Sequence, residues 1–389
     1  MPDQFTEVTT QSWFSRLGDS LKAVVAGTVM FILAFPLLFW NEGRAVRTAK
    51  SNKEGAKAVV SLPADKVNPA YEGRLIHVTG TPVADETLTD DQLGVTTKGM
   101  VLARTVEMYQ WQENKSSETK KKLGGGTETV TTYKYDTVWS EGAKDSAFFK
   151  DKTGHENPPK SWDSKKFTAK VVTLGAFTVP PALAPRLGSA EPIPVDDKTV
   201  AAFPGDLRGR AHVAGNTILI GEDPQKPRVG DLRISFTVTK PEPSTIVAMQ
   251  SGSTFAGYQT RAGDKIFMAE TGTKSAAEMF TEAEATNSAF TWFLRALGFV
   301  VMFVGVLLVF RPLVTIGDVV PIIGTILGFG AGIIAFIVSV VFTSLTIAIA
   351  WIFFRPLIGI LMLLVAGGGI FALAQLKKRR AATAVPAAM

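Results

Sequence analysis

The feature that most constrains this chain is an apolar block that runs from Trp292 to Leu376. Leu294–Phe310 holds one charge, Arg295, at its start, and Val319–Phe354 contains no ionisable side chain. A helix needs about 20 apolar residues to cross a hydrocarbon core of about 30 Å, whereas a water-soluble fold rarely contains such a run. The block therefore predicts three membrane crossings, at residues 291–311, 332–354 and 355–375.

Two Phe-Arg-Pro-Leu repeats, at Phe310–Leu313 and Phe354–Leu357, divide this block. Proline suits the first turn of a helix because its missing N–H has no partner there, and an arginine can extend to the membrane interface. We therefore expect a turn at each repeat. Segment 312–331, with Asp318 and Pro321, is interpreted as interfacial or re-entrant, because residues 319–354 barely allow two crossings and a turn.

A second apolar segment, residues 21–40, is long enough for one further crossing. It is too long for the apolar region of a signal peptide, and Trp40-Asn41-Glu42 lacks the small residues of a cleavage site. We expect a retained transmembrane helix preceded by an N-terminal tail, residues 1–20.

The polar region between these apolar segments, residues 41–290, is predicted to be one large extramembrane domain rich in β-strands. Apolar and polar residues alternate in several short segments, as in half-buried strands. These are Arg74–Val78, Val101–Gln112, Val130–Trp139, Thr217–Ile220, Leu232–Thr239 and Thr245–Met249. The second and third should pair as an antiparallel hairpin with an exposed tip at Lys120–Gly126, where three glycines supply turn geometry.

Two further patterns lie within or after this domain. Gly73-Arg74 followed by His77 resembles Gly209-Arg210 followed by His212, so two related β units are one interpretation of the domain. Ser275 and Glu278 form a capping-box pattern, which predicts a helix that begins there and continues into the next crossing.

The predicted fold is an α+β membrane protein with four transmembrane helices and the β-rich domain inserted between the first and second.

The orientation follows from the basic tail, residues 376–389. Lys377, Lys378, Arg379 and Arg380 lie just beyond the last predicted crossing, where the positive-inside rule places them at the cytoplasmic membrane surface. With four crossings the N-terminal tail is also cytoplasmic, and the domain is extracytoplasmic. The basic residues after the first crossing, from Arg44 to Lys53, favour the opposite orientation, but long translocated domains largely escape this rule.

The composition excludes several functions. The net charge of +6 is modest and forms no long basic face, so no nucleic-acid partner is expected. The chain has no cysteine, and His77, His155 and His212 form no metal-binding or catalytic pattern. We therefore expect that the protein is not an enzyme and that it has no catalytic residue, cofactor or metal site. Gly324, Gly328 and Gly332 provide small surfaces for close packing between helices of one chain or of several.

A set of motifs in family order resembles the LUMA family, also called transmembrane protein 43. The matching segments are NEGRA after the first crossing, EGRLIH, VEMYQW, GHENP, VGDLRISF and the final RPL. Their key residues are Asn41, Glu42, Gly43, Arg44, Glu72, Gly73, Arg74, His77, Glu107, Tyr109, Trp111, Gly154, His155, Gly230, Asp231, Arg233, Arg355 and Pro356.

The resemblance implies four crossings, termini on one face and a large domain on the other, together with a membrane-organising role and self-association. It supplies no catalytic residues, and the lack of cysteine favours a bacterial member of the family. We expect a non-enzymatic scaffold whose domain binds protein or lipid, with membrane lipids, further copies of the chain and envelope proteins as partners. The expected location is a bacterial inner membrane with a periplasmic domain, or the endoplasmic reticulum or inner nuclear membrane in a eukaryote. Two alternatives are a membrane-embedded enzyme and a sensor, acting on lipid or envelope components.

Overall fold

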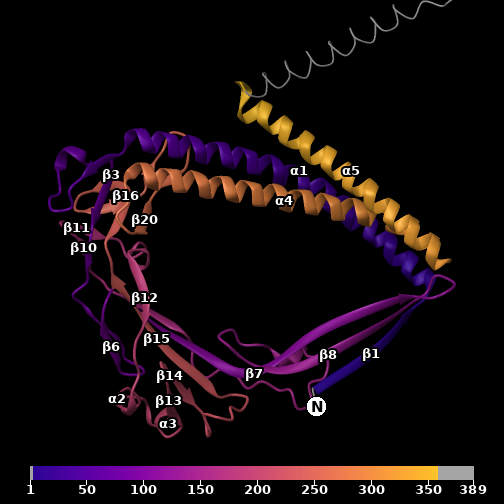
Figure 1. The fold of residues 1–389 in the computed structure, drawn as a ribbon, viewed down its shortest axis with the longest axis horizontal. Coiled ribbons are helices and arrows are strands. Elements are labelled where there is room, and N and C mark those ends of the chain that lie inside the picture. The colour runs from indigo at the N-terminus through magenta and orange to yellow at the C-terminus, as the bar shows by residue number, and fades with distance from the viewer. Residues whose placement is uncertain (1–2, 358–389) are drawn as a thin grey trace, which may run out of the picture. The chain divides into compact units, whose positions relative to one another are not determined.

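The structure, a computed structural model, describes residues 3–357 (Figure 1). It contains two compact units. The strand unit comprises residues 3–9, 51–120 and 128–283, and the helix unit comprises residues 10–50, 121–127 and 284–357. The coarse prediction of an α+β protein with apolar helices and a large β-rich region is confirmed.

One sheet of the strand unit is organised around a long hairpin. Its strand order is β1-β8-β7-β15-β14-β13, with β12 also paired to β15 and β9 to β7. The strands are β1 (Asp3–Gln11), β7 (Val101–Lys121), β8 (Thr127–Ser140), β9 (Lys165–Thr168), β12 (Gly188–Pro192), β13 (Ala211–Ala214), β14 (Thr217–Ile220) and β15 (Leu232–Pro241). The predicted pairing of Val101–Gln112 with Val130–Trp139 is confirmed, since β7 and β8 are neighbours.

The second sheet has the order β2-β3-β16-β17-β11-β10-β4, with β20 also paired to β16. Its strands are β2 (Val60–Leu62), β3 (Leu75–Gly80), β4 (Pro82–Val83), β10 (Val172–Leu174), β11 (Phe177–Val179), β16 (Ser244–Ser251), β17 (Thr254–Ala256) and β20 (Met268–Thr271). Two small hairpins join β5 (Thr87–Asp90) to β6 (Val95–Lys98) and β18 (Tyr258–Gln259) to β19 (Lys265–Ile266). Short helices α2 (Asp197–Ala201) and α3 (Gly205–Arg208) precede β13.

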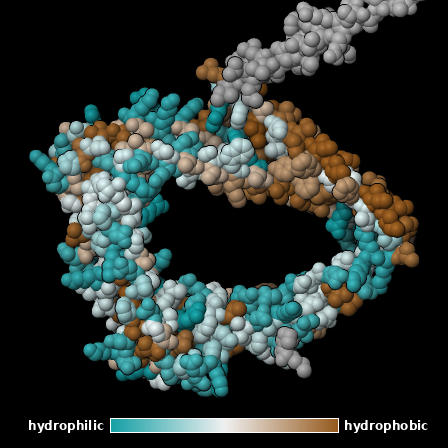
Figure 2. Space-filling model, viewed as in Figure 1, coloured by the Kyte–Doolittle hydropathy of each residue, from teal (hydrophilic) through white to brown (hydrophobic). Residues whose placement is uncertain are grey.

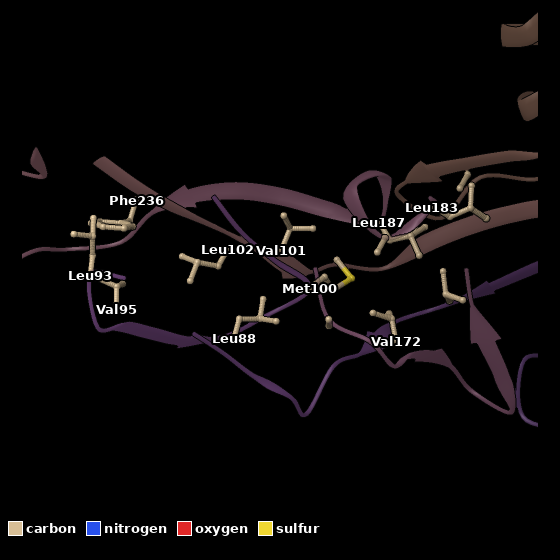
Figure 3. Close-up of a cluster of buried hydrophobic side chains, with 14 of the residues drawn as sticks. Leu88, Leu93, Val95, Met100, Val101, Leu102, Val172, Leu183, Leu187 and Phe236 are labelled. Atoms are coloured by element: carbon tan, nitrogen blue, oxygen red, sulfur yellow. The ribbon is translucent and has the colours of Figure 1, made fainter. Parts of the chain in front are cut away.

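The core of the strand unit follows the predicted alternation of apolar side chains. In β7, Leu102, Val106 and Met108 are buried, and the antiparallel register places them opposite Val238, Ile234 and Leu232 of β15. Adjacent side chains on one face of paired strands pack directly against each other. Figure 3 shows part of this core, in which Leu102 and Phe236 lie among side chains from several other strands.

The two segments of the suspected internal repeat occupy different places. His77 lies in β3, which has a neighbour on each side in the second sheet, whereas His212 lies in β13 at the edge of the first sheet. The different environments give no support to a duplication, which remains a prediction.

The helix unit consists mainly of three long apolar helices, α1 (Trp13–Ala58), α4 (Ala276–Gly317) and α5 (Pro321–Phe354). The last turns of α1 and the first turns of α4 belong to the strand unit. All three are long and apolar enough to cross a membrane, within the residues that the structure describes. Figure 2 shows apolar side chains gathered over these helices and mainly polar ones over the strands.

The helices pack through aromatic and very small side chains. In α1, Phe31 and Phe35 contact Phe342 of α5 edge to face, at centroid distances of 5.5 and 6.0 Å. A Cβ atom on Gly27 would lie 2.5 Å from the Gly305 carbonyl oxygen of α4, so two backbones touch at this point. Small residues permit such close approach and the dispersion contacts it provides.

Several predicted boundaries differ from the structure. The turn expected at Phe310–Leu313 is wrong: α4 continues through Pro312 to Gly317, and α5 begins at Pro321. Proline removes only one hydrogen bond, and the apolar packing on either side holds the helix together. Residues 321–331, expected to be interfacial or re-entrant, form the first part of α5.

Other boundary predictions are confirmed or lie outside the described residues. Ser275 and Glu278 cap each other reciprocally, with the Ser275 amide 2.7 Å from the Glu278 carboxylate, and α4 begins at Ala276. α5 ends at Phe354, directly before Arg355-Pro356. The fourth predicted crossing, 355–375, and the basic tail lie beyond residue 357.

Candidate functional site

The NEGRA motif lies in α1 and forms the centre of a buried polar network. The Glu42 carboxylate is fully buried and accepts hydrogen bonds from Arg295 of α4, at 2.6 and 2.9 Å. It also accepts one from the Trp351 indole of α5, at 2.8 Å. One carboxylate therefore joins all three long helices.

A second set of contacts links the same motif to α4. Arg44 donates to Asn287 Oδ1 at 2.9 Å and to Thr291 Oγ1 at 2.8 Å. Asn41 donates to the Thr291 carbonyl at 3.1 Å, and Gly43 leaves space that the Phe354 ring of α5 occupies. Polar groups in an apolar helix bundle must be paired internally, and Asn41, Glu42 and Arg44 contribute to that pairing.

Three other motifs converge on β7 in the strand unit. Glu107 and Arg233 are register partners on β7 and β15, and Arg233 Nε lies 2.7 Å from the Glu107 carboxylate. The Arg233 guanidinium also covers the Trp139 ring, with 4.9 Å to its centroid, and Tyr109 packs on the same ring. Backbone hydrogen bonds link Tyr109 to Gly230 and Asp231, and Gly230 has a φ of 101°, which only glycine adopts readily.

The GHENP motif lies against the same strands. The His155 ring stacks on Tyr135 at a centroid distance of 3.9 Å and meets Trp111 edge-on at 4.8 Å. The Asn157 side chain imitates a neighbouring strand: it accepts from the Trp111 amide at 2.7 Å and donates to the Trp111 carbonyl at 3.0 Å. The segment is thus attached to β7 by side-chain hydrogen bonds.

Tyr135 has a perturbed hydroxyl within this cluster. Burial, together with a hydrogen bond to the Glu113 carboxylate at 2.8 Å, raises the pKa of Tyr135 to about 12. The hydroxyl also accepts a hydrogen bond from the Asp151 amide at 2.8 Å. The phenol is therefore held neutral and serves as a structural link.

The EGRLIH motif belongs to the second sheet and does not join this cluster. Glu72 accepts from the Gly252 amide at 2.9 Å, and Gly73 donates to the Gln250 carbonyl at 3.0 Å. The Arg74 guanidinium lies over the Tyr71 ring, and His77 contacts the Ser61 hydroxyl and the Lys274 carbonyl. The motifs therefore form three separate networks.

Sequence reasoning missed a polar cavity of about 400 Å³ in the strand unit. Its wall includes Arg104, which pairs with the fully buried Asp90 at 2.7 and 3.0 Å and donates to Gln92 at 2.8 Å. Trp162 and Lys165 also line it. Asp90 neutralises the arginine, so the cavity presents polar groups without a strong net charge. Over residues 3–357, histidine, aspartate and glutamate form no cluster of three suited to a metal ion.

The predicted helix-packing glycines differ in their surroundings. A Cβ atom on Gly324 would collide with Asp318, and one on Gly328 would contact Val314 at 3.6 Å, so both positions face α4 or the turn after it. Gly332 has no neighbour within 4 Å among the described residues. The closer contact, Gly27 with Gly305, was not predicted.

Three apolar helices and a β-rich region define this chain as a membrane protein with a large strand-containing domain. The chain belongs to the transmembrane protein 43 family, whose profile matches residues 108–356. It is 34% identical to the rat and human transmembrane protein 43, over 89% and 90% of this chain and 88% and 89% of those proteins. It is 28% identical to a Drosophila melanogaster homologue over 87% of this chain and 90% of the other. No solved structure matches it significantly.

Proposed function

We propose that this protein is a non-enzymatic scaffold that organises the membrane in which it lies, binds protein or lipid through its strand unit, and self-associates. The observation that carries the proposal is the contrast between its charged motif residues, which are paired inside the chain, and the bulky apolar side chains that α5 exposes. The proposed location is a bacterial inner membrane, or the endoplasmic reticulum or inner nuclear membrane of a eukaryote.

The paired charges argue against catalysis by these residues. Glu42, Glu107 and Asp90 each lie within 2.7 Å of an arginine. A general acid or base must exchange its proton with a substrate, and a carboxylate occupied by a guanidinium is poorly placed to do so. These pairs instead fix the relative positions of helices or strands.

The two faces of α5 support a role in association. Its buried positions are small or hydroxyl-bearing: Gly324, Ala331, Ala335, Ser339, Thr343, Thr346 and Ala350. Its exposed positions include Ile322 and Phe329, each with about three-quarters of its surface accessible, at 73% and 74%. Small residues let α5 approach its neighbours in the chain, and the bulky residues are left to contact acyl chains or another copy.

Cross-linking tests self-association, because the chain has no cysteine of its own. We expect Phe329→Cys, in membranes at several protein-to-lipid ratios, to give covalent dimers with a short bis-maleimide. Ala335→Cys, buried on the opposite face, is the matched control and should stay monomeric. Monomers from both variants at every ratio would refute the self-association part of the proposal.

A turnover assay distinguishes the scaffold from the enzyme alternative. The purified protein is incubated with phospholipids and with lipid-linked envelope precursors, and products are followed by mass spectrometry. We expect no conversion. Turnover that disappears in Glu107→Gln, with folding retained, would establish the enzyme reading instead.

A further inference from the structure

The polar cavity of the strand unit lies where strand β9 pairs with β7. The register sets Arg104 of β7 directly opposite Lys165 of β9, so both side chains start from the same face of the sheet. The loop before β9 supplies Trp162 and Asp163, and Gln92 comes from the turn between β5 and β6. Three separate segments of the strand unit therefore enclose one space of about 400 Å³.

The floor of this cavity is an arginine whose charge is already matched. The Arg104 side chain is 2% exposed and pairs with Asp90, whose side chain has no exposed surface. Its Nε atom donates to the Asp163 carbonyl at 3.1 Å, and an Nη atom donates to Gln92 Oε1 at 2.8 Å. Together with the two contacts to Asp90, these occupy four of the five N–H groups of the guanidinium. Within residues 3–357, one N–H is left for a bound molecule.

The rim of the cavity carries hydrogen-bonding groups of both kinds. Lys165 and Asp163 line it with exposed side chains of opposite charge, and the side-chain amide of Gln92 adds a further donor. The half-buried Trp162 ring forms part of the wall, and the guanidinium carbon of Arg104 lies 5.4 Å from its centroid. The cavity thus combines an aromatic surface with donors and an acceptor.

The charges of the cavity cancel. Asp90 matches Arg104, and Asp163 matches Lys165. A phosphate or carboxylate gains little here, because the arginine already holds a carboxylate and Asp163 repels a second anion. An apolar ligand is also disfavoured, since it would displace water from polar groups without replacing the hydrogen bonds. The cavity therefore matches a neutral molecule that donates and accepts hydrogen bonds over most of its surface.

We infer that this cavity binds a neutral sugar unit. The hydroxyls around the edge of a pyranose ring accept from Arg104 and Lys165 and donate to Asp163. The C–H groups of the ring pack on the accessible part of Trp162. The volume of about 400 Å³ lies within the range of about 300–1,000 Å³ that is typical of small-molecule sites. The inference does not depend on the scaffold function.

Ligand-observed NMR on the full chain tests the inference. The protein is held in phosphatidylcholine nanodiscs, because alkyl glycoside detergents would themselves supply sugar. The probes are the methyl glycosides of glucose, galactose, mannose and N-acetylglucosamine, with inorganic phosphate as the anionic comparison. We expect saturation transfer to at least one glycoside that phosphate does not displace. Transfer to none of them, or displacement by phosphate, would overturn the inference.

Two neighbouring lysines of β9 provide a matched pair of variants. Lys165→Ala removes a donor from the cavity, and the loss of a charged hydrogen bond should weaken glycoside binding by about tenfold or more. Lys166→Ala removes a lysine that is also exposed but starts from the opposite face of the strand, where its register partner is Ala103. It should bind like the wild type. Equal affinities of the two variants would contradict a site at this cavity.

Asp163→Ala separates a sugar from an anion. The substitution removes the exposed carboxylate but keeps the backbone carbonyl that holds Arg104, so the floor of the cavity is retained. A sugar loses an acceptor and should bind about tenfold more weakly or worse. An anion loses a repulsive neighbour and should bind more tightly. Tighter phosphate binding with unchanged glycoside binding would refute the sugar assignment.

The sugar can belong to a soluble glycoside or to the headgroup of a glycolipid, and a competition experiment distinguishes these sources. Liposomes that carry a ceramide glycoside of the bound sugar are added to the protein, with ceramide liposomes as the control. Loss of the methyl glycoside signal with the ceramide glycoside alone assigns the cavity to glycolipid headgroups. An unchanged signal assigns it to soluble glycosides, and both results support the sugar unit as the ligand.

Discussion

Glu42 and Arg295 form an ion pair across 253 residues of sequence, with the carboxylate fully buried and the Arg295 Nε atom 2.6 Å from it. The pair joins α1 to α4, and the Trp351 indole bound to the same carboxylate adds α5. Neither partner could be assigned to the other from sequence, because nothing in the spacing of the two residues specifies which helix faces meet.

Glu42→Ala should destabilise the helix unit by about 3 kcal/mol or more. Removal of one partner leaves a largely buried guanidinium and an indole N–H without an acceptor, which typically costs 3–5 kcal/mol. The thermal midpoint of the detergent-solubilised protein, followed by helical circular dichroism, measures the effect.

The double variant Glu42→Leu with Arg295→Met is the control for this prediction. It removes both charges together and should recover much of the loss, because apolar replacements of similar volume often match a buried ion pair. Equal destabilisation of single and double variants would show that the two residues are not coupled.

Gly27→Leu should disturb the contact between α1 and α4. The new Cβ atom would lie 2.5 Å from the Gly305 carbonyl oxygen and 2.7 Å from Leu308 Cβ, so the helices must separate, at a cost of about 1–3 kcal/mol or more. Gly330→Leu in α5 adds the same side chain where no described atom lies within 4 Å, and its thermal midpoint should not fall.

Asn157→Asp should loosen the GHENP segment from β7. The carboxylate can still accept from the Trp111 amide, but it cannot donate to the Trp111 and Lys144 carbonyls that the amide reaches at 3.0 and 3.1 Å. Two carbonyls would then face a negative charge, at a cost of about 1–3 kcal/mol or more. Hydrogen exchange of residues 152–160 should accelerate, whereas Asn216→Asp at an exposed turn should leave it unchanged.

Stability at alkaline pH should depend on Tyr135. Its folded-state pKa of about 12 lies above the ordinary value of 10, so the neutral phenol is favoured in the folded protein. The corresponding stability is fully present below about pH 10 and is lost as the pH rises toward 12. The difference in unfolding free energy between the wild type and Tyr135→Phe should therefore shrink over this interval. A constant difference from pH 9 to pH 12 would contradict it.

Local patterns in the sequence predicted several of the strands and the apolar helices, but not strand β1, which lies in the segment expected to be a tail. Alternation in Val101–Gln112 and Leu232–Thr239 predicted β7 and β15, and the capping box at Ser275 predicted the start of α4. These signals are local: side-chain direction repeats every two residues in a strand and about every 3.6 in a helix, so they can be read from neighbouring residues. The family motifs could also be recognised from the sequence, because each is a run of consecutive residues.

Which of these elements meet depends on the folded chain as a whole. Several contacts in the structure join residues that are not neighbours in sequence. They are the pairing of β1 with β8, the contact of Gly27 with Gly305, the ion pairs of Glu42 with Arg295 and of Asp90 with Arg104, and the ion pair of Lys121 in the hairpin tip with Asp318. Hydropathy measures how much apolar surface a helix has, but not which residues of another helix or strand it meets. That depends on the shapes and polar groups of side chains that come together only in the folded chain.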